Sequence, residues 1–307
     1  MSKHPKEYRW PDRRRGKRPQ FWIGLLSASI LVLTILADKT AWTGPWTQPK
    51  GRLYVNYSVI STNRKKIKAF DGTSMYVGKI RTLSHTTLVK YGVLEDFDIH
   101  VEIPYELSSL EGDPAATIRN FGDGRFGFQY RLLRENRDAP LSLALGFEYK
   151  RPLSSYRVDK LSSPGEQQED YEYRFLLGRF FDIFEKQSYF SIEGGYRTRT
   201  SAPPDEVFGY GELGMRFVPK VAGRVFVYGV DALGGIGLVN DPQFVEIETR
   251  EGAPPFPFVG ENYVKVGLGL TVYPTDSVDV GVFYSIPTYR SNTSLDRHIG
   301  ISIGYNF

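Results

Sequence analysis

Residues 297–307 read RHIGISIGYNF, and every second side chain from Ile299 to Phe307 is apolar. The side chains between them are polar or small. A period of two residues places the two sets on opposite faces of a β-strand. The same alternation recurs across residues 141–149, 264–272 and 278–286, so we expect a chain built from strands with one apolar face and one polar or small face.

Twelve segments carry this alternation, and most exceed the length of about five or six residues usual in globular proteins. They match the roughly nine to eleven residues that a tilted strand needs to cross a bilayer. Lipid offers no hydrogen-bond partner to a strand edge, so a sheet that spans a membrane must close on itself. We predict an all-β fold, a transmembrane antiparallel β-barrel of about 12 strands, at residues 51–61, 78–92, 97–107, 121–133, 140–151, 170–181, 188–200, 206–217, 223–234, 260–273, 277–287 and 296–307.

The connections between these segments fall into two classes. Every second one is short, at residues 93–96, 134–139, 182–187, 218–222 and 274–276. The others are mostly longer and rich in Gly, Pro, Ser or charge, at residues 62–77, 108–120, 152–169, 235–259 and 288–295, with 201–205 as a short exception. Outer-membrane barrels have short periplasmic turns and longer extracellular loops, so this pattern favours that class and places both ends of the barrel on the periplasmic side.

A secreted β-sandwich is the alternative fold, because its strands also alternate between apolar and polar residues. Sandwich strands are usually short, with turns about every 8 to 12 residues. The long segments and the two classes of connection therefore favour the barrel.

Charge and hydropathy divide the chain into three parts. Eight of the 39 Lys and Arg residues and two of the 35 Asp and Glu residues lie within residues 1–20, so the rest carries slightly more acidic than basic groups. This excludes a domain-wide basic surface for nucleic acid. The apolar run 21–37 follows the basic stretch, which indicates that residues 1–37 are a signal peptide, with cleavage after Ala37, or an N-terminal membrane segment.

Residues 38–50 are expected to form an N-terminal periplasmic segment or plug, and 51–307 the outer-membrane barrel. The first of these parts contains Trp42 and Trp46 together with Pro45 and Pro49. Tryptophan is enriched at membrane interfaces, so the two indoles can serve either a plug or an interface anchor. Tyrosines and phenylalanines near strand ends are expected to form the interfacial girdles, namely Tyr105, Tyr149, Tyr171, Tyr173, Tyr196, Tyr273, Tyr305 and Phe307.

Several stretches resemble one family. They are Ala41–Thr43, Gln48–Gly51 leading into 52–61, YGVLEDFD at 91–98, VEIPY at 101–105 and GDGRFGFQYRLL at 122–133. They resemble outer-membrane transporters of the phenol-degradation meta-pathway type, which are loosely related to channels for hydrophobic compounds. The resemblance covers most of residues 41–307 and implies a barrel in the bacterial outer membrane, but it contains no catalytic motif. The final strand ending in Phe307 resembles the signal that the outer-membrane assembly machinery reads.

Enzymatic function finds little support in the sequence. The chain has no cysteine, which excludes cysteine-based catalysis and Cys-ligated metals. Outside the leader the histidines are His85, His100 and His298, and none has a serine two residues later on the same strand face. Asp98, His100 and Glu102 share a face, but such a cluster is more often a satisfied polar network in the lumen. We expect no catalytic residue, metal or cofactor.

Inward-facing charges are the candidates for a solute path. Both signs occur in similar numbers, which fits either cross-strand ion pairs that fill the interior or a wet pore that selects solutes. Arg197 and Arg199, two residues apart, are the best candidates for an electropositive patch. The lumen candidates are Arg131, Glu148, Lys150, Arg174, Glu193, Arg197, Arg199, Glu212, Arg216, Lys265, His100 and Glu102. Glu172, Asp231 and Asp279 are also expected to face inward.

The predicted function is an outer-membrane channel or transporter, passive, for small solutes of hydrophobic or aromatic character. Its expected partners are outer-membrane lipid, the assembly machinery and the solute, with no nucleic acid. The alternative is a structural or adhesive barrel whose lumen is filled with side chains. The loop 235–259 contains PPFPF at 254–258, which fits either a lid over the barrel mouth or packing on its rim. The run Gly234–Gly237 lacks a following helix and is not a phosphate loop.

Overall fold

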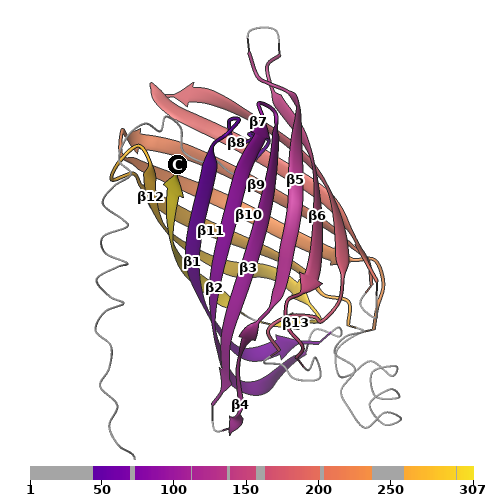
Figure 1. The fold of residues 1–307 in the computed structure, drawn as a ribbon. Helices are drawn as coiled ribbons and strands as arrows, with labels where there is room; N and C mark the ends of the chain where they lie inside the picture. Colours follow the sequence, from indigo (N-terminus) through magenta and orange to yellow (C-terminus); the bar gives the residue numbers. More distant parts are fainter. Residues whose placement is uncertain are drawn as a thin grey trace, which may run out of the picture. The chain divides into compact units, whose positions relative to one another are not determined.

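The computed structural model describes residues 44–69, 73–111, 113–136, 139–156, 163–200, 204–236, 259–294 and 296–307. The leader at 1–37 and the loop residues 254–258 lie outside this set. Within the described ranges twelve antiparallel strands close into a barrel (Figure 1), which confirms the predicted fold class. No helix in these ranges is long and apolar enough to span a membrane.

The barrel strands follow one another around the wall in chain order. They are β1 (Leu53–Lys68), β2 (Ser74–Leu94), β3 (Phe97–Leu110), β5 (Asp123–Leu133), β6 (Ser142–Pro152), β7 (Asp170–Ile183), β8 (Lys186–Arg199), β9 (Glu206–Val218), β10 (Val221–Ala232), β11 (Asn262–Val272), β12 (Val278–Ser291) and β14 (Arg297–Asn306). Two short strands lie off this wall: β4 (Asp113–Phe121) pairs with β3, and β13 (Thr293–Ser294) pairs with β1.

Pairing of β1 with β14 closes the barrel. Ten residue pairs run from Tyr54 opposite Asn306 to Asn63 opposite Arg297. On its other side β1 pairs with β2, so each of the twelve strands has two neighbours. Closure matters because an unpaired edge in hydrocarbon leaves backbone N–H and C=O groups without partners.

The two faces of the wall have inverted polarity relative to a soluble protein. The outward residues are large and apolar; Ile299, Ile301 and Ile303 are 53%, 59% and 52% exposed. The inward face buries acids instead, and Asp98 and Glu172 are 0% and 1% exposed. This arrangement follows from the surroundings, because lipid solvates the outer face and polar partners fill the lumen.

Short turns and both ends of the barrel lie on one side. Phe184 and Glu185 form the turn between β7 and β8 with φ of 50° and 62°, as the tightest hairpin turns require. The turns at 95–96 and 219–220 lie at the same end as the C-terminus, which is at the top of Figure 1. By the rule for outer-membrane barrels, this is the periplasmic end.

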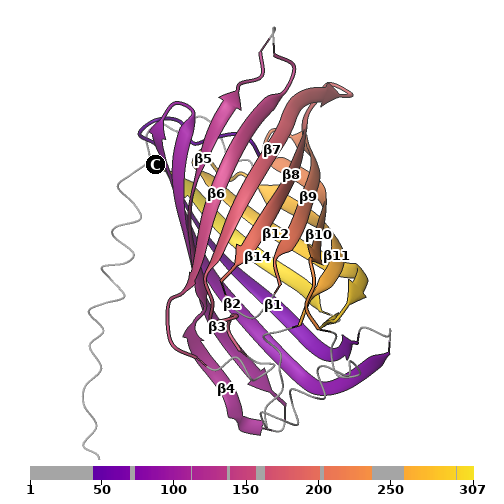
Figure 2. The ribbon, with the colours of Figure 1, turned by 90° about the vertical axis from the view of Figure 1, so that its right-hand side faces the viewer.

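At the opposite end the structure differs from the predicted loops. Residues 62–77 were expected to be a loop, but β1 continues to Lys68 and β2 begins at Ser74. The predicted loop 108–120 contains most of β4. These extensions project beyond the other strands (Figure 2). Alternation is lost there because a strand outside the bilayer needs no continuous apolar face, and the sequence pattern therefore failed to show it.

Candidate functional site: the barrel lumen

Arginines and glutamates alternate on one side of the lumen, on the inward face of β3 and β5 to β9; we call this the charged wall. Arg125 Nη1 donates to Glu148 Oε1 at 2.5 Å and to Glu172 Oε1 at 2.8 Å. Arg197 Nε donates to Glu172 Oε1 at 2.7 Å, and the same guanidinium contacts Glu206. The pairs form because register places Arg197 opposite Glu172 on one side and Glu206 on the other.

Arg174 extends this network toward β8 and β6. Its Nε lies 3.1 Å from Glu193 Oε1, and its Nη1 lies 3.5 Å from Glu148 Oε2. His100 Nε2 lies 3.0 Å from Glu148 Oε2, and a carboxylate partner requires the imidazole to donate. The charged wall is thus balanced in sign and heavily hydrogen-bonded.

The extracellular end of the charged wall is covered by part of the loop between β6 and β7. Lys150 Nζ lies 2.5 Å from Asp170 Oδ2 and also contacts Glu166, a residue of this loop. Arg199 Nη2 lies 3.1 Å from Glu166 Oε1. Burial alone would raise the pKa of Glu166, but the cations of Lys150 and Arg199 outweigh it and hold the pKa far below its usual value. The loop is therefore held over the lumen by charge.

The other side of the lumen, on β10 to β12 and β14, carries aromatic rings packed on glycines; we call it the glycine–aromatic wall. A Cβ at Gly267 would lie 2.2 Å from the ring of Phe226, and one at Gly300 would lie 2.2 Å from the ring of Phe283. The two rings meet edge to face with their centroids 6.4 Å apart. Glycine is required here because each ring lies flat over a neighbouring backbone.

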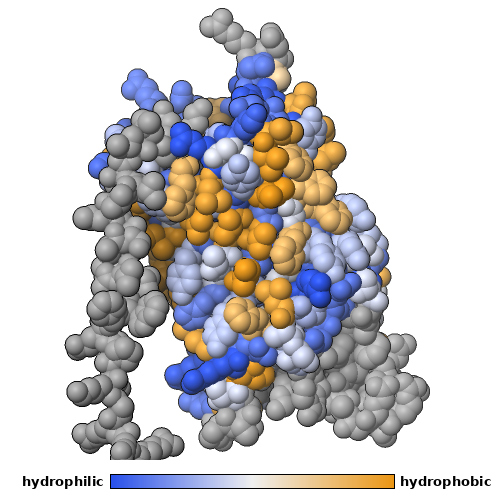
Figure 3. Space-filling model, viewed as in Figure 1, coloured by the Kyte–Doolittle hydropathy of each residue, from blue (hydrophilic) through white to orange (hydrophobic). Residues whose placement is uncertain are grey.

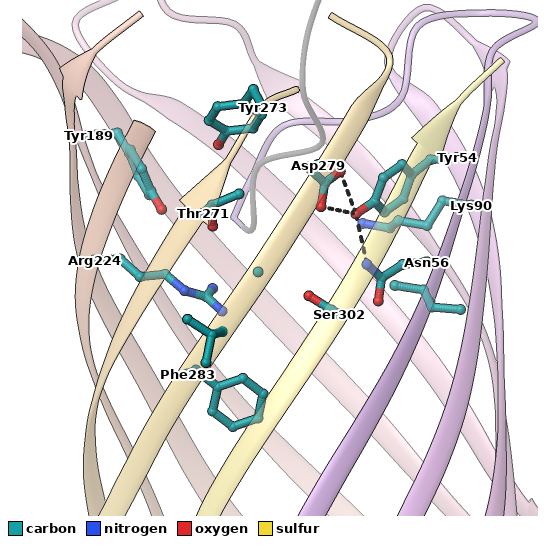
Figure 4. A pocket seen from close by; sticks show the side chains of 13 residues that line it. Tyr54, Asn56, Lys90, Tyr189, Arg224, Thr271, Tyr273, Asp279, Phe283 and Ser302 are labelled. Carbon is teal, nitrogen blue, oxygen red and sulfur yellow. Dashed lines mark hydrogen bonds between the residues drawn. The ribbon is translucent and has the colours of Figure 1, made fainter. Parts of the chain in front are cut away.

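A cavity of about 210 Å³ lies between this wall and β1, β2 and β8 near the periplasmic end; we call it the periplasmic cavity. Figure 4 shows the side chains of Arg224 and Lys90 pointing into it from opposite sides. Tyr54 Oη donates to Asp279 Oδ2 at 3.2 Å and accepts from Asn56 Nδ2 at 3.2 Å. The remaining lining combines hydroxyls with one phenyl ring, from Tyr189, Thr271, Tyr273, Ser302 and Phe283.

A second cavity of about 490 Å³, the central cavity, lies against the charged wall. Its lining includes Glu102, Arg174 and the aromatic residues Phe208 and Tyr228. Lys90 lines both cavities. Its ammonium forms no hydrogen bond or ion pair with any residue of the described ranges, unlike most other lumen cations.

Residues 44–50 cross the periplasmic end of the lumen, and we call them the strap. Gln129 Nε2 donates to the Gly44 carbonyl at 3.0 Å, and the Gln48 backbone N–H donates to Asp98 Oδ2 at 2.9 Å. The indole of Trp46 packs against Phe180, with ring centroids 4.4 Å apart, and against Tyr189.

Two glycines of the wall leave room for the strap. A Cβ at Gly92 would lie 2.0 Å from the Pro49 carbonyl oxygen, and one at Gly178 would lie 2.9 Å from Pro45. Gly44 lines the central cavity, so the strap reaches the space beside the charged wall. Trp42, the other indole of the predicted plug, lies outside the described residues.

The remaining predicted lumen residues also lie on the inward face. Glu212 accepts from Arg224 Nη1 at 2.9 Å and contacts the hydroxyls of two tyrosines. Lys265 Nζ lies 3.2 Å from His298 Nε2, and Arg216 lies over the ring of Tyr273 at 5.0 Å.

Arg131 lies at the periplasmic mouth, where its Nε donates to Asp96 Oδ1 at 2.7 Å. Arg134 donates to the same oxygen at 2.9 Å. Partial burial would raise the pKa of Asp96, but these hydrogen bonds from Arg134 and Arg131 lower it below its usual value. Two arginines therefore bind the carboxylate of one turn residue, and this fixes the structure of the periplasmic mouth.

Two predicted orientations are wrong. Asp231 was expected to face inward, but it is exposed on the outer face, opposite the outward Val207. It lies near the extracellular end of β10, where the outer face meets water and tolerates a charge. Tyr273 was expected in a girdle, but it lines the periplasmic cavity. Arg197 and Arg199 do face inward, and both are held between carboxylates.

Among the described lumen cations that were missed from the sequence are Arg125, Arg224 and Lys90. On β5, Arg125 lies an even number of residues before Gln129 and Arg131 and therefore on the same inward face. Extending the predicted alternation by one more inward position toward the start of the strand would have identified it. Around Arg224 the residues on both faces of β10 are apolar, so the sequence does not show which of them face the lumen. Lys90 precedes a register shift in the pairing of β2 with β3.

Asp98, His100 and Glu102 all face the lumen, but they do not form one cluster with shared hydrogen bonds. Asp98 accepts from the strap, whereas His100 pairs with Glu148. Within the described part of the chain, no group of three His, Asp or Glu side chains is arranged to hold a metal ion.

No known family's sequence profile matches this chain, and no curated protein matches it by sequence. Its structure is similar to the COG4313 outer-membrane channel from Pseudomonas putida F1, with a TM-score of 0.68 at 10% identity, covering 88% of this chain and 100% of that chain. The translocator domain of the autotransporter NalP from Neisseria meningitidis gives a TM-score of 0.44 at 12% identity, covering 93% and 94% of the two chains. The KdgM porin in complex with oligogalacturonate gives 0.46 at 9% identity, covering 83% and 99%.

The first of these similarities covers most of this chain and agrees with the closed barrel formed by the twelve strands. The chain has the fold of a bacterial outer-membrane β-barrel channel.

Proposed function

We propose that this protein is a passive channel of the bacterial outer membrane for small solutes that combine an aromatic ring with an anionic or polar group. The observation that carries the proposal is the pair of lumen cavities that share Lys90. Solute channels need sites that bind favourably but weakly, arranged in series. A lone ammonium between an aromatic, hydroxyl-rich cavity and a charged one meets that requirement.

The size and lining of the periplasmic cavity support a solute with a single ring. Its volume of about 210 Å³ exceeds the roughly 150 Å³ of a protein cavity known to hold benzene. Phe283 offers a ring face, while Lys90 and Arg224 offer cations from opposite sides.

The strap is proposed to narrow the periplasmic exit. It contacts β3 through Asp98 and β8 through Tyr189, two strands on different parts of the wall. A solute leaving the central cavity toward the periplasm would pass beside Gly44 and Trp46. Residues 38–50 would then act as the plug that their composition suggested.

Influx into proteoliposomes tests the proposal. Benzenesulfonate is aromatic and permanently charged, so it crosses lipid poorly, and xylose serves as an uncharged solute without an aromatic ring. We expect the wild-type protein to admit benzenesulfonate faster than empty liposomes do. Lys90→Met should reduce benzenesulfonate influx several-fold and leave xylose influx nearly unchanged.

Lys186→Met is the matched control, because Lys186 is exposed at a periplasmic turn. It should leave both rates unchanged. Influx no faster than that of empty liposomes for both solutes would refute the channel and favour the structural barrel, for which the dense ion pairing of the charged wall is the supporting observation. Equal loss in both lysine variants would refute the role of Lys90.

A further inference from the structure

We propose that the extracellular extension of β1 to β4 binds the phosphate groups of a glycolipid of the lipid A type in the outer leaflet. The surface consists of Lys65, Lys66, Lys68, Arg81 and Arg119, which we call the basic face. Lys65, Lys66, Arg81 and Arg119 are exposed, and Lys68 is half-buried. This binding is separate from solute passage and does not depend on the proposed channel function.

The position of the basic face follows from the strands below it. On β2 the outward residues from Tyr91 to Leu83 span nine positions, about the length that crosses a bilayer. The next outward residue is Arg81, which pairs with Asn63 and Ser109 on its two neighbours. The basic face therefore begins at the edge of the lipid-facing band, on the extracellular side.

Pairing on β4 places Arg119 near Arg81. Arg119 lies opposite Leu107, the last large apolar residue on the outer face of β3, and Leu107 pairs with Leu83, the outward position next to Arg81. A register shift between Arg64 and Lys66 marks a bulge at Lys65. A bulge re-aims side chains, and here it falls where the strand leaves the lipid-facing band. Figure 3 shows strongly hydrophilic residues at the lower, extracellular end of the outer surface formed by β1 to β4, below a more hydrophobic zone.

No counterion for these five cations lies among the side chains that the structure describes. Their side chains form no hydrogen bond or ion pair with any side chain that the structure describes. Neighbouring basic residues differ, since Arg64 Nε lies 3.1 Å from Asp296 Oδ2 and Lys79 Nζ lies 3.6 Å from Glu111 Oε1. Cations left unpaired at the membrane surface attract anionic headgroups, and phosphate is a strong partner for Lys and Arg.

The rim of the barrel is not uniformly basic. On the far side Asp231 is exposed on the outer face near the extracellular end of β10. If charge were needed outside the bilayer only for solubility, acidic and basic side chains would serve equally well. Concentration of one sign on one arc of the rim, at headgroup level, points to phosphate of membrane lipid rather than to solubility alone.

Retention of diphosphoryl lipid A by the purified full-length protein, measured by native mass spectrometry, tests the proposal. The variant K65Q/K66Q/R81Q/R119Q should lower the apparent affinity by about ten-fold or more, since each basic group near a membrane surface contributes to binding an anionic headgroup. Binding of fully dephosphorylated lipid A should be weak to the wild type and unaffected by the substitutions.

The control variant R179Q/K186Q/K220Q removes three exposed basic residues at the periplasmic end, all outside the strap, and should bind lipid A like the wild type. A heat-dependent shift in gel mobility verifies that each variant is folded, and solute influx should not change. Equal affinity of the two variants, or equal binding of dephosphorylated lipid A, would overturn the proposal. Displacement of lipid A by an equal concentration of inorganic phosphate would also overturn the assignment to a lipid.

Discussion

The charged wall and the glycine–aromatic wall fill the same lumen by opposite means. On the charged wall, long side chains from adjacent strands interlock through hydrogen bonds, and Glu172 is 1% exposed between Arg125 and Arg197. On the other wall, rings lie flat over Gly267 and Gly300. The difference indicates that one wall provides rigidity and the other leaves space beside it for the periplasmic cavity. Each of the following experiments can separate the two roles.

Glu172→Leu should have the largest effect. It leaves the guanidinium groups of Arg125 and Arg197 without a shared acceptor, and removing one partner of a buried ion pair costs about 3 to 5 kcal/mol. The temperature at which the unboiled protein loses its compact gel mobility should fall markedly. Tyr173→Leu, on the outward face of the same strand where the side chain is 55% exposed, is the control. Equal midpoints for the two variants would show that the charged wall does not hold the barrel together.

Gly267→Val should have an intermediate effect. The new Cβ would meet the ring of Phe226, and overpacking of this kind costs about 1 to 3 kcal/mol. The displaced ring would also enter the lumen, so single-channel conductance should fall. Gly194→Val is the control, because nothing lies within 4 Å of a Cβ at Gly194. Conductance that is the same in both variants would contradict a role of the glycine–aromatic wall in shaping the path.

Glu166→Gln should have the smallest effect, at most about 1 kcal/mol, since the carboxylate is partly exposed. Because its pKa is lowered in the folded state, Glu166 stabilises the loop at neutral pH. This contribution begins to decrease as the pH falls below about 4.3, the usual value of the group, and is lost only when the pH reaches the lowered pKa. Hydrogen exchange of residues 163–169, corrected for intrinsic rates, should increase in the variant at pH 7, and the difference from the wild type should shrink as the pH is lowered below 4.

Glu185→Gln is the control for this experiment, since Glu185 lies exposed in a periplasmic turn. Protection of the loop that is identical in wild type and Glu166→Gln at pH 7 would argue against its electrostatic attachment to Lys150 and Arg199.

Much of the wall could be predicted from the sequence because lipid imposes a strict rule. Most outward positions within the bilayer are apolar, so alternation located all twelve barrel strands. Outside the bilayer the rule does not apply, and there the prediction failed, as at β4 and in the extension of β1 from Thr62 to Lys68. Asp231 was misplaced for the same reason, because the outer face beyond the bilayer no longer reports orientation.

The partners inside the lumen could not be predicted. Whether Arg125 meets Glu148, or the strap meets Asp98, depends on register, strand tilt and the reach of long side chains across the interior. An odd or even position along a strand gives the face on which a residue lies, but not which side chain of another strand it contacts. Lys90 illustrates the limit: it has no hydrogen bond or ion pair among the described residues because of where other charges lie, and no local sequence pattern shows this.

Closure through β14 makes the whole fold depend on one ten-residue strand. Until Arg297–Asn306 is in place, β1 and β12 each expose an edge, with ten and eight residues awaiting their partners. Neither edge can remain in hydrocarbon. A truncated chain that lacks only this strand would therefore lose the whole barrel rather than one twelfth of it, and would persist only as an aggregate or a substrate for periplasmic proteases.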